Sequence, residues 1–455
     1  MPIKKIPLYI TYIAIFLIPI FPLIVADSFF FPFITGKAFY FRLLVEIAFS
    51  GWIILAFLDA RYRPKLTPLA VGVTIFAFIV LLADLLGVNP IRSLWSNFER
   101  MEGWLGIIHL WAFFLVTTNL FGSGESGRRI WHRFINVSLL VALVVAGYGL
   151  FQLFGWADIH QGSSRIDASL GNAAYMAVYM LINGGFAVYM YFVAKAGKII
   201  NDRFLKWAYP IIAILFFFEL FETATRGTIL GLFGGIMLSL VLYALLARNN
   251  SGKSRLYAAG TIALIVIIGL VFWFNRDASF VKSNETLNRL ATISLNEVKT
   301  QARGYIWPVA VSGAMERPIL GWGQENFNYI FNANYNPAMY TQEQWFDRAH
   351  SVYLDWLVAS GLVGLIAYLA LYILLLVVIW KSDLKIGEKS VLTGLVAGYA
   401  IHNVFVFDNL ASYVLFFTIL GFADSFKPGR SFDFLGEEPV GRDTVEYIVV
   451  PIVIV

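Results

Sequence analysis

The chain has 455 residues, of which 59% are hydrophobic, 17% are aromatic and only 14% are charged. Soluble globular domains are usually about a quarter charged, so this composition excludes an ordinary soluble protein and indicates a polytopic helical membrane protein. The formal net charge of +5 comes without a basic patch on a polar segment, which argues against nucleic-acid binding, and the absence of cysteine excludes disulfides and thiol chemistry.

Long apolar runs recur along the whole chain, and a membrane-spanning helix needs about 20 mostly apolar residues. Twelve stretches meet this requirement loosely: residues 8–26, 38–58, 67–87, 103–121, 134–154, 172–194, 207–224, 226–247, 256–274, 352–380, 390–407 and 409–426. The predicted fold is therefore all-α, with about 12 transmembrane helices and one large loop between the ninth and the tenth.

The positive charges of the short loops predict the orientation of these helices. Lysine and arginine concentrate on one side of the predicted membrane, for example in 61–65, 128–133 and 381–389. Cytoplasmic loops are the ones enriched in these residues, so both termini are predicted to be cytoplasmic. The chain then divides into helices one to nine (1–274), a large periplasmic loop (275–351), helices ten to twelve (352–426) and a cytoplasmic tail (427–455).

The few cations of the outer side stand next to predicted helix N-termini. Arg100, Arg165 and Arg226 precede or open such helices, His350 precedes another, and Asn172 and Thr225 are suitable N-cap residues. Cations are unfavourable beside the partial positive charge of a helix N-terminus, and a bound anion would resolve the conflict. Snorkelling of the arginines to lipid headgroups is the alternative.

The large outer loop shows its own order. Leu287 and Leu290 begin a near-helical apolar spacing in 284–300, which predicts a helix lying on the membrane surface. A second helix is predicted from Arg303 to Met315, and Pro318 follows its end. Glycines then indicate a turn, and the segment 326–340, which is rich in Asn and Tyr, is predicted to be irregular.

The outer side offers a histidine and several arginines as chemical groups. His350 lies at the mouth of a helix, and histidine is the side chain most readily used as a base near neutral pH. Arginine binds phosphate through its planar fork, so the combination suits displacement of a diphosphate leaving group. The sequence has no paired carboxylates of the D-x-D type, no G-x-S-x-G elbow and no H-E-x-x-H pattern, so neither a metal nor a cofactor is expected.

Four segments together resemble a known family. They are RIDASLGNAAYMA (165–177), TATRGTILG (223–231), RGYIWPVAVSGAMERPILGWGQENF (303–327) and AHSVYLDWLVASGLVGLIAYL (349–369). In order and spacing they are similar to the O-antigen ligase / O-antigen polymerase (Wzy-type) superfamily of bacterial inner-membrane glycosyltransferases. The resemblance covers roughly residues 90–425 and implies a GT-C-like, twelve-helix body with one large periplasmic loop before a histidine-bearing helix start.

The resemblance also implies an activity. Such enzymes move a glycan from undecaprenyl diphosphate, without a metal, to a periplasmic acceptor, which is the lipid A core in ligases and another glycan repeat or a protein hydroxyl in relatives. Arg226 and Arg303 correspond to the arginines that meet the diphosphate, and His350 corresponds to the base. Further substrate contacts are expected from five residues chosen mainly by position: Arg165, Arg100, Arg348, Asn172 and Trp322.

Two readings of another kind remain open at this stage. A transporter or flippase for a lipid-linked or anionic solute would need charged groups deep in the bundle, for which Arg42, Glu46 and Asp84 are candidates. A structural membrane scaffold would not need an outer loop that carries arginines and a histidine at a helix start. The acceptor, the sugar, the anomeric outcome, the oligomeric state and the role of the tail are not determined by the sequence.

Overall fold

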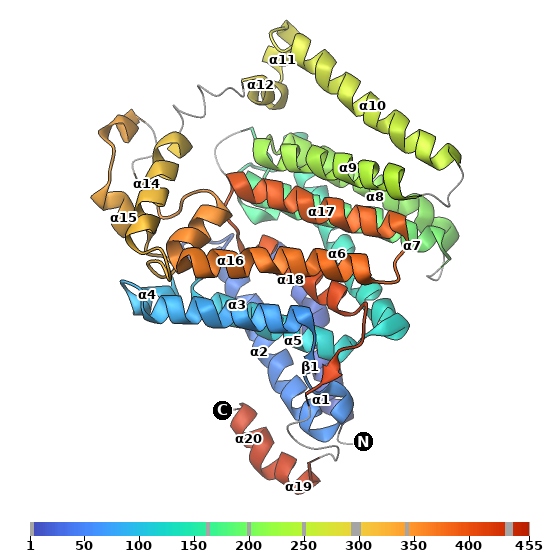
Figure 1. The fold of residues 1–455 in the computed structure, drawn as a ribbon, viewed down its shortest axis with the longest axis vertical. Helices are drawn as coiled ribbons and strands as arrows, with labels where there is room; N and C mark the ends of the chain where they lie inside the picture. Colours follow the sequence, from blue (N-terminus) through green and yellow to red (C-terminus); the bar gives the residue numbers. More distant parts are fainter. Residues whose placement is uncertain are drawn as a thin grey trace.

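The computed structural model describes residues 4–160, 164–197, 202–247, 252–292, 302–341, 345–432 and 440–454 and is almost entirely helical (Figure 1). Each of the twelve predicted stretches corresponds to a helix. These are α1 (Lys5–Leu17) with η1 (Ile18–Leu23), α2 (Thr35–Leu58), α3 (Pro68–Leu85), α5 (Trp104–Phe121), α6 (Gly124–Leu153), α7 (Ala173–Lys195), α8 (Asp202–Glu222), α9 (Arg226–Leu246), α10 (Gly252–Phe274), α16 (Val352–Lys381), α17 (Ile386–Phe405) and α18 (Leu410–Asp424).

Within the described residues, 10 helices are long and apolar enough to cross a membrane. This finding confirms the predicted class, a polytopic helical membrane protein. The helices α17 and α18 are not among those 10, and α18 has only 15 residues. The number of twelve spanning helices, the assignment of the large loop to the periplasm and the division of the chain into four parts stay predictions.

The helices pack most closely where small residues face each other. In α9, a Cβ atom added at Gly231 or Gly235 would lie 2.4 Å from the carbonyl oxygen of Gly398 or Gly394 in α17. Only glycine allows two helix backbones to approach so closely in an apolar bundle. By contrast, only 6% of the apolar span of α10 is buried, against 83% for α7. The helix α7 is therefore enclosed by other helices, whereas α10 lies at the periphery of the bundle (Figure 1).

The helix α16 is interrupted near its beginning. Gly361 has φ 64° and ψ −166°, outside the helical region, and separates 352–360 from the longer remainder. The preceding loop occupies the break, because the amides of Trp322 and Gly323 donate to the carbonyls of Val358 and Ala359 over 2.8 and 2.9 Å. The first part of α16 is therefore hydrogen-bonded to the outer loop as well as to its own helix.

The outer loop contains more regular structure than the sequence predicts. Its elements are α11 (Ser279–Ser283), α12 (Glu285–Ala291), α14 (Ala302–Glu316), α15 (Phe327–Ala333) and η4 (Pro337–Thr341). The helix expected from Arg303 is confirmed as α14. The expectation of an irregular segment at 326–340 is wrong, since α15 forms there. The surface helix expected over 284–300 is described only as α12, and its last residues, 293–300, lie outside the described part.

The helix α15 forms because its apolar side chains are used in packing. Phe327, Ile330 and Phe331 follow helical spacing and are at least 95% buried in a small core with Ile306 and Ala310 of α14. This tertiary contact outweighs the low helix propensity of the neighbouring asparagines. The loop helices α14 and α15 lie with α4 (Pro90–Trp95) at the same end of the bundle, on the left of Figure 1.

The remaining short elements connect the other helices and hold the tail. The 3-10 turns η2 (Ala60–Tyr62) and η3 (Ala168–Leu170) precede α3 and α7. The two-residue strand β1 (Lys65–Leu66) pairs antiparallel with β2 (Arg430–Ser431). The tail ends in α19 (Arg442–Thr444), a π-helical turn (Val445–Val449) and α20 (Val450–Ile454), of which Val445 and Val449 pack on Leu58 at the end of α2.

Candidate active site

A cavity of about 1210 Å³ lies where the outer loop meets the helix ends. This volume exceeds the range of about 300–1,000 Å³ usual for small-ligand pockets, so the cavity suits a large substrate. The N-terminal ends of α5, α7, α9 and α16 all reach it, through Arg100, Asn172, Arg226 and His350. The structure thus brings together helix N-termini that the sequence analysis singled out, and the partial positive charge of these ends favours an anion in the cavity.

The lining of this cavity is rich in arginine. Among the described residues it contains five arginines and two carboxylates, namely Arg100, Arg165, Arg226, Arg289 and Arg303 with Glu99 and Asp347. Arg100 forms an ion pair within the cavity wall, where a guanidinium nitrogen lies 3.1 Å from a carboxylate oxygen of Asp347. Burial lowers the pKa of Arg303, and the positive charges of Arg226 and Arg289 lower it further. These cations therefore repel one another, and a multivalent anion would relieve the repulsion.

The outer loop supplies two of these arginines and helps to place a third. Arg303 donates from Nη2 to the carbonyl of Phe405 over 2.9 Å, which fixes α14 against the end of α17. Arg226 donates from Nη2 to the hydroxyl of Thr292, just after α12, over 3.0 Å. Arg289 in α12 was not singled out by the sequence analysis. The signal was present, since Arg289 lies on the polar face of the predicted surface helix, but nothing in the sequence places that face over the cavity.

His350 enters the cavity in an unusual backbone conformation. Its φ of 55° is in the left-handed region, which few residues with a side chain adopt. The imidazole lies edge-on between the rings of Phe346 and Phe407, with centroid distances of 5.4 and 5.1 Å, and it makes no hydrogen bond to the described residues. Burial, followed by the positive charge of Arg303, lowers the pKa of His350 to about 4. The ring is therefore neutral at pH 7 and has a nitrogen available to accept a proton.

Arg165 and Asn172 line the cavity while making contacts that shape its wall. Arg165 donates from Nε to the carbonyl of Thr223 over 2.8 Å and from Nη2 to the hydroxyl of Thr225 over 2.9 Å. These bonds hold the turn between α8 and α9, which ends at Arg226. Asn172 caps α7, since its side-chain oxygen accepts from the amide of Ala174 over 2.8 Å. Arg165 and Asn172 thus fix the N-terminal ends of α9 and α7, and both also line the cavity.

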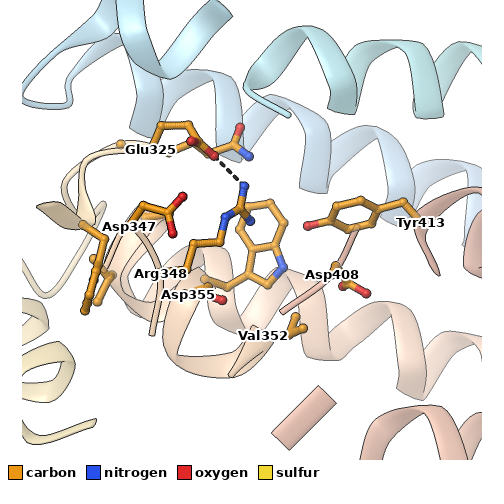
Figure 2. Close-up of a pocket in the computed structure, with 13 residues that line it drawn as sticks. Glu325, Asp347, Arg348, Val352, Asp355, Asp408 and Tyr413 are labelled. Atoms are coloured by element: carbon orange, nitrogen blue, oxygen red, sulfur yellow. Dashed lines mark hydrogen bonds and ion pairs between the residues drawn. The ribbon is translucent and has the colours of Figure 1, made fainter. Parts of the chain in front are cut away.

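Arg348 is only two residues from His350, but it points into a different space. It does not line the large cavity; it lines a small pocket of about 40 Å³, with Asp355, Asp408 and Tyr413 nearby (Figure 2). Its Nη2 lies 2.5 Å from Glu325 and 2.9 Å from Glu102. Arg348 therefore connects the segment that carries His350 to the loop before α15 and to the start of α5, and we do not count it among substrate contacts.

Trp322 also lies away from the large cavity. Its indole nitrogen donates to the carbonyl of Gly313 over 2.8 Å, and the guanidinium of Arg317 lies 4.9 Å from the ring centroid. Trp322 packs against the small core of the outer loop. The aromatic residues that line the cavity come instead from Phe30 to Phe33, Tyr175, Trp345 and Phe407. The wall at Phe30 to Phe33 was not singled out by the sequence analysis, because it is distant in the chain from the outer loop.

The ion pairs around Arg348 lead to a testable prediction. Replacing Glu325 by glutamine keeps the size of the side chain but removes its charge, so the segment carrying His350 is held less firmly. We expect kcat of the reaction proposed below to fall by about tenfold or more, up to the roughly 10²-fold that a misplaced group can cost. KM for the donor should stay near its original value, because Arg226 and Arg303 are untouched. A raised KM with unchanged kcat would contradict this positioning role; Arg348→Lys, which keeps the charge, should retain more activity than Arg348→Met.

The three charged residues that the sequence offers for a transport path, Arg42, Glu46 and Asp84, have structural partners. Asp84, which is fully buried, accepts a hydrogen bond from the amide of Gln324 over 2.7 Å. Glu46 lies 3.0 Å from His109, and Arg42 donates to the carbonyl of Met101. These contacts fasten the helices to one another and to the outer loop.

Comparison with known proteins shows which family model this part of the chain matches. Residues 211–369 match the family model described as O-antigen ligase. The matched region runs from α8 to α16 and contains Arg226, Arg289, Arg303 and His350. A search of curated proteins finds no match. In the described residues, no group of three or more His, Cys, Asp or Glu is arranged to hold a metal ion.

Proposed function

The chain belongs to the O-antigen ligase / O-antigen polymerase superfamily of glycosyltransferase-type membrane enzymes, and from this premise we propose that it transfers a glycan from undecaprenyl diphosphate to an acceptor hydroxyl on the periplasmic face. The observation that carries the proposal is the single cavity shared by Arg226, Arg303 and His350. A diphosphate needs cations and a hydroxyl nucleophile needs a base, and the cavity wall provides both.

The proposed reaction uses these residues in separate roles. The acceptor oxygen attacks the anomeric carbon of the donor sugar while His350 takes the hydroxyl proton. The bond between that carbon and the diphosphate oxygen breaks, and its electron pair leaves with the diphosphate. Arg226 and Arg303 are placed to stabilise the charge on the leaving group, which is greatest in the transition state. His350 then returns its proton to the solvent or to the released diphosphate.

The arrangement of the cavity supports a ligase or a polymerase equally. Its volume of about 1210 Å³ accommodates both a glycan and an acceptor sugar, and Tyr175 and Trp345 offer aromatic surfaces for sugar rings. We favour the ligase type, with the lipid A core as acceptor, because the matched family model carries that description. Transfer to another glycan repeat or to a protein hydroxyl would use the same base and the same arginines.

A transfer assay tests this proposal. Purified protein is incubated with undecaprenyl-diphosphate-linked glycan and, in separate reactions, with lipid A core, with a second glycan repeat and with a hydroxyl-bearing peptide. We expect a lengthened product with one of these acceptors. We also expect the rate to be unchanged by EDTA, since the arginines supply the positive charge that a divalent metal ion would otherwise provide. Vesicle flux of the substrate without any transfer product would refute the proposal in favour of a transporter.

The pH dependence of the reaction gives a second test. The pKa of free His350 is lowered to about 4 by burial and by neighbouring arginines, of which Arg303 is the strongest. A bound diphosphate brings negative charge, which favours the protonated imidazole and raises the pKa. The neutral imidazole is the base, so activity falls on the acid side. We expect the acid limb of kcat, which reports the complex, to lie at higher pH than that of kcat/KM, which reports the free enzyme. Coincident limbs, or the reverse order, would contradict a base surrounded by phosphate-binding arginines.

A further inference from the structure

A second cavity, of about 610 Å³, lies at the opposite ends of the helices. It is lined by α7, α8, α9, α10 and α17, and most of its surface is apolar, with Leu181, Val188, Phe217, Leu232 and Leu395 among its walls. Its far end is marked by Lys195 and Tyr243, which are at or near the C-terminal ends of α7 and α9. The first cavity is at the N-terminal ends of the same two helices.

Three helices line both cavities. Along α9, Leu230 belongs to the first cavity and Gly231 begins the wall of the second. Along α7 the change comes between Tyr175 and Leu181, six residues or about 9 Å of helix, and α17 contributes Phe405 to the first cavity and Leu395 to the second. A linear molecule bound by its head in the first cavity can therefore lie along α9 and enter the second.

The length of α9 matches a chain that crosses the bilayer. Its 21 residues span about 30 Å, which is about the thickness of the hydrocarbon core. The outer wall of the second cavity is α10, the least buried of the candidate spans, which packs on α9 and leaves most of its surface to lipid. A chain thus has access to the cavity from the side, within the bilayer.

We propose that the second cavity binds the distal part of the isoprenoid chain of the lipid-linked donor while the diphosphate is bound among the arginines. This inference rests on the proposed function. Lipid tails are as apolar as the cavity wall, so burial from water does not drive the chain into it. The favourable free energy of binding comes from packing of the chain in the cavity and from the high effective concentration of a chain whose diphosphate is already bound. The site therefore distinguishes long donors from short ones.

One pair of variants tests this site. Leu232→Trp fills the cavity, whereas Leu238→Trp adds the same bulk to α9 at a position that is 37% exposed and outside the cavity wall. Each is assayed with the undecaprenyl-linked donor and with a donor that has the same glycan on two isoprene units, which end close to the diphosphate. We expect Leu232→Trp to raise KM for the long donor about tenfold, equivalent to loss of about 1.4 kcal/mol, and to leave KM for the short donor unchanged. Leu238→Trp should change neither value.

The outcomes separate this inference from the proposed function. If Leu232→Trp changes KM equally for both donors, or for neither, the second cavity does not bind the isoprenoid chain, while glycan transfer itself remains established. Loss of transfer from both donors in the wild-type protein would overturn the proposed function.

A labelling experiment on the wild-type protein does not depend on how the variants fold. An undecaprenyl donor with a photoreactive group at its far end should label peptides containing Tyr243 or Tyr257, which line the second cavity. Labelling should persist in excess phospholipid. Displacement by phospholipid, or labelling confined to other helices, would contradict the inference.

Discussion

Replacing His350 by asparagine is expected to lower the rate of glycan transfer by about 10²–10⁴-fold, the contribution of a well-placed general base. Asparagine removes the imidazole but is among the residues that tolerate the left-handed conformation found at this position, where φ is 55°. The loss would therefore report the missing base and not a distorted loop. The measurement is kcat with the undecaprenyl-linked donor at saturating acceptor.

A second histidine provides the control. His109 in α5 lies 3.0 Å from Glu46 and outside the cavity, so His109→Gln should transfer glycan at close to the original rate. Donor binding by His350→Asn should also be preserved, because the arginines remain. An asparagine variant that retains full activity would remove the base assignment, and a variant that no longer binds donor would indicate that His350 holds the cavity together.

Replacing Arg303 by alanine is expected to reduce kcat by about 10²–10³-fold, as loss of one donor to a developing anion does in other enzymes. Arg303 lies on the outer loop, is held to the end of α17 by the carbonyl of Phe405, and has no ion-pair partner among the described residues. Its charge is therefore available to the leaving diphosphate. Arg303→Lys keeps the charge but not the planar fork, and it should recover only part of the rate.

The matched control is Arg317→Ala, also in the outer loop. Arg317 packs on Trp322 outside the cavity, so its loss should leave kcat unchanged. An equal fall in both variants would mean that Arg303 acts through the stability of the loop. Arg226→Ala should resemble Arg303→Ala, and a double variant that is little worse than either single one would indicate that the two guanidinium groups act as one unit.

The sequence predicts the helices and the polar or charged residues at their N-terminal ends, because both features depend only on residues that are close together in the chain. Apolar runs identify each helix, and Arg100, Asn172, Arg226 and His350 are recognisable from their places before helix starts. The orientation of alternate helices predicts that these four ends lie on the same side, and only the structure shows that they line one cavity. The convergence of Arg303 with them was predictable only through the family resemblance.

The contacts of the loop residues are not encoded locally. Arg348 and His350 are two positions apart in an irregular segment, and nothing in the sequence indicates that one faces Glu102 and Glu325 while the other faces the cavity. The helix α15 escaped prediction because its stability comes from Phe327, Ile330 and Phe331 packing on α14. Arg289 was not predicted as a cavity residue, because its place in the lining depends on where α12 lies over the bundle.

The interruption of α16 at Gly361 couples the outer loop to the residue proposed as base. Residues 352–360 form a short helical segment that follows His350, and its C-terminal end accepts hydrogen bonds from the amides of Trp322 and Gly323. A Cβ atom at Gly361 would lie 2.2 Å from the carbonyl oxygen of Ile319, so no other residue fits the joint. A structural change in 318–323, which lies outside the large cavity, is thus expected to reach the imidazole through this segment and not through the cavity wall.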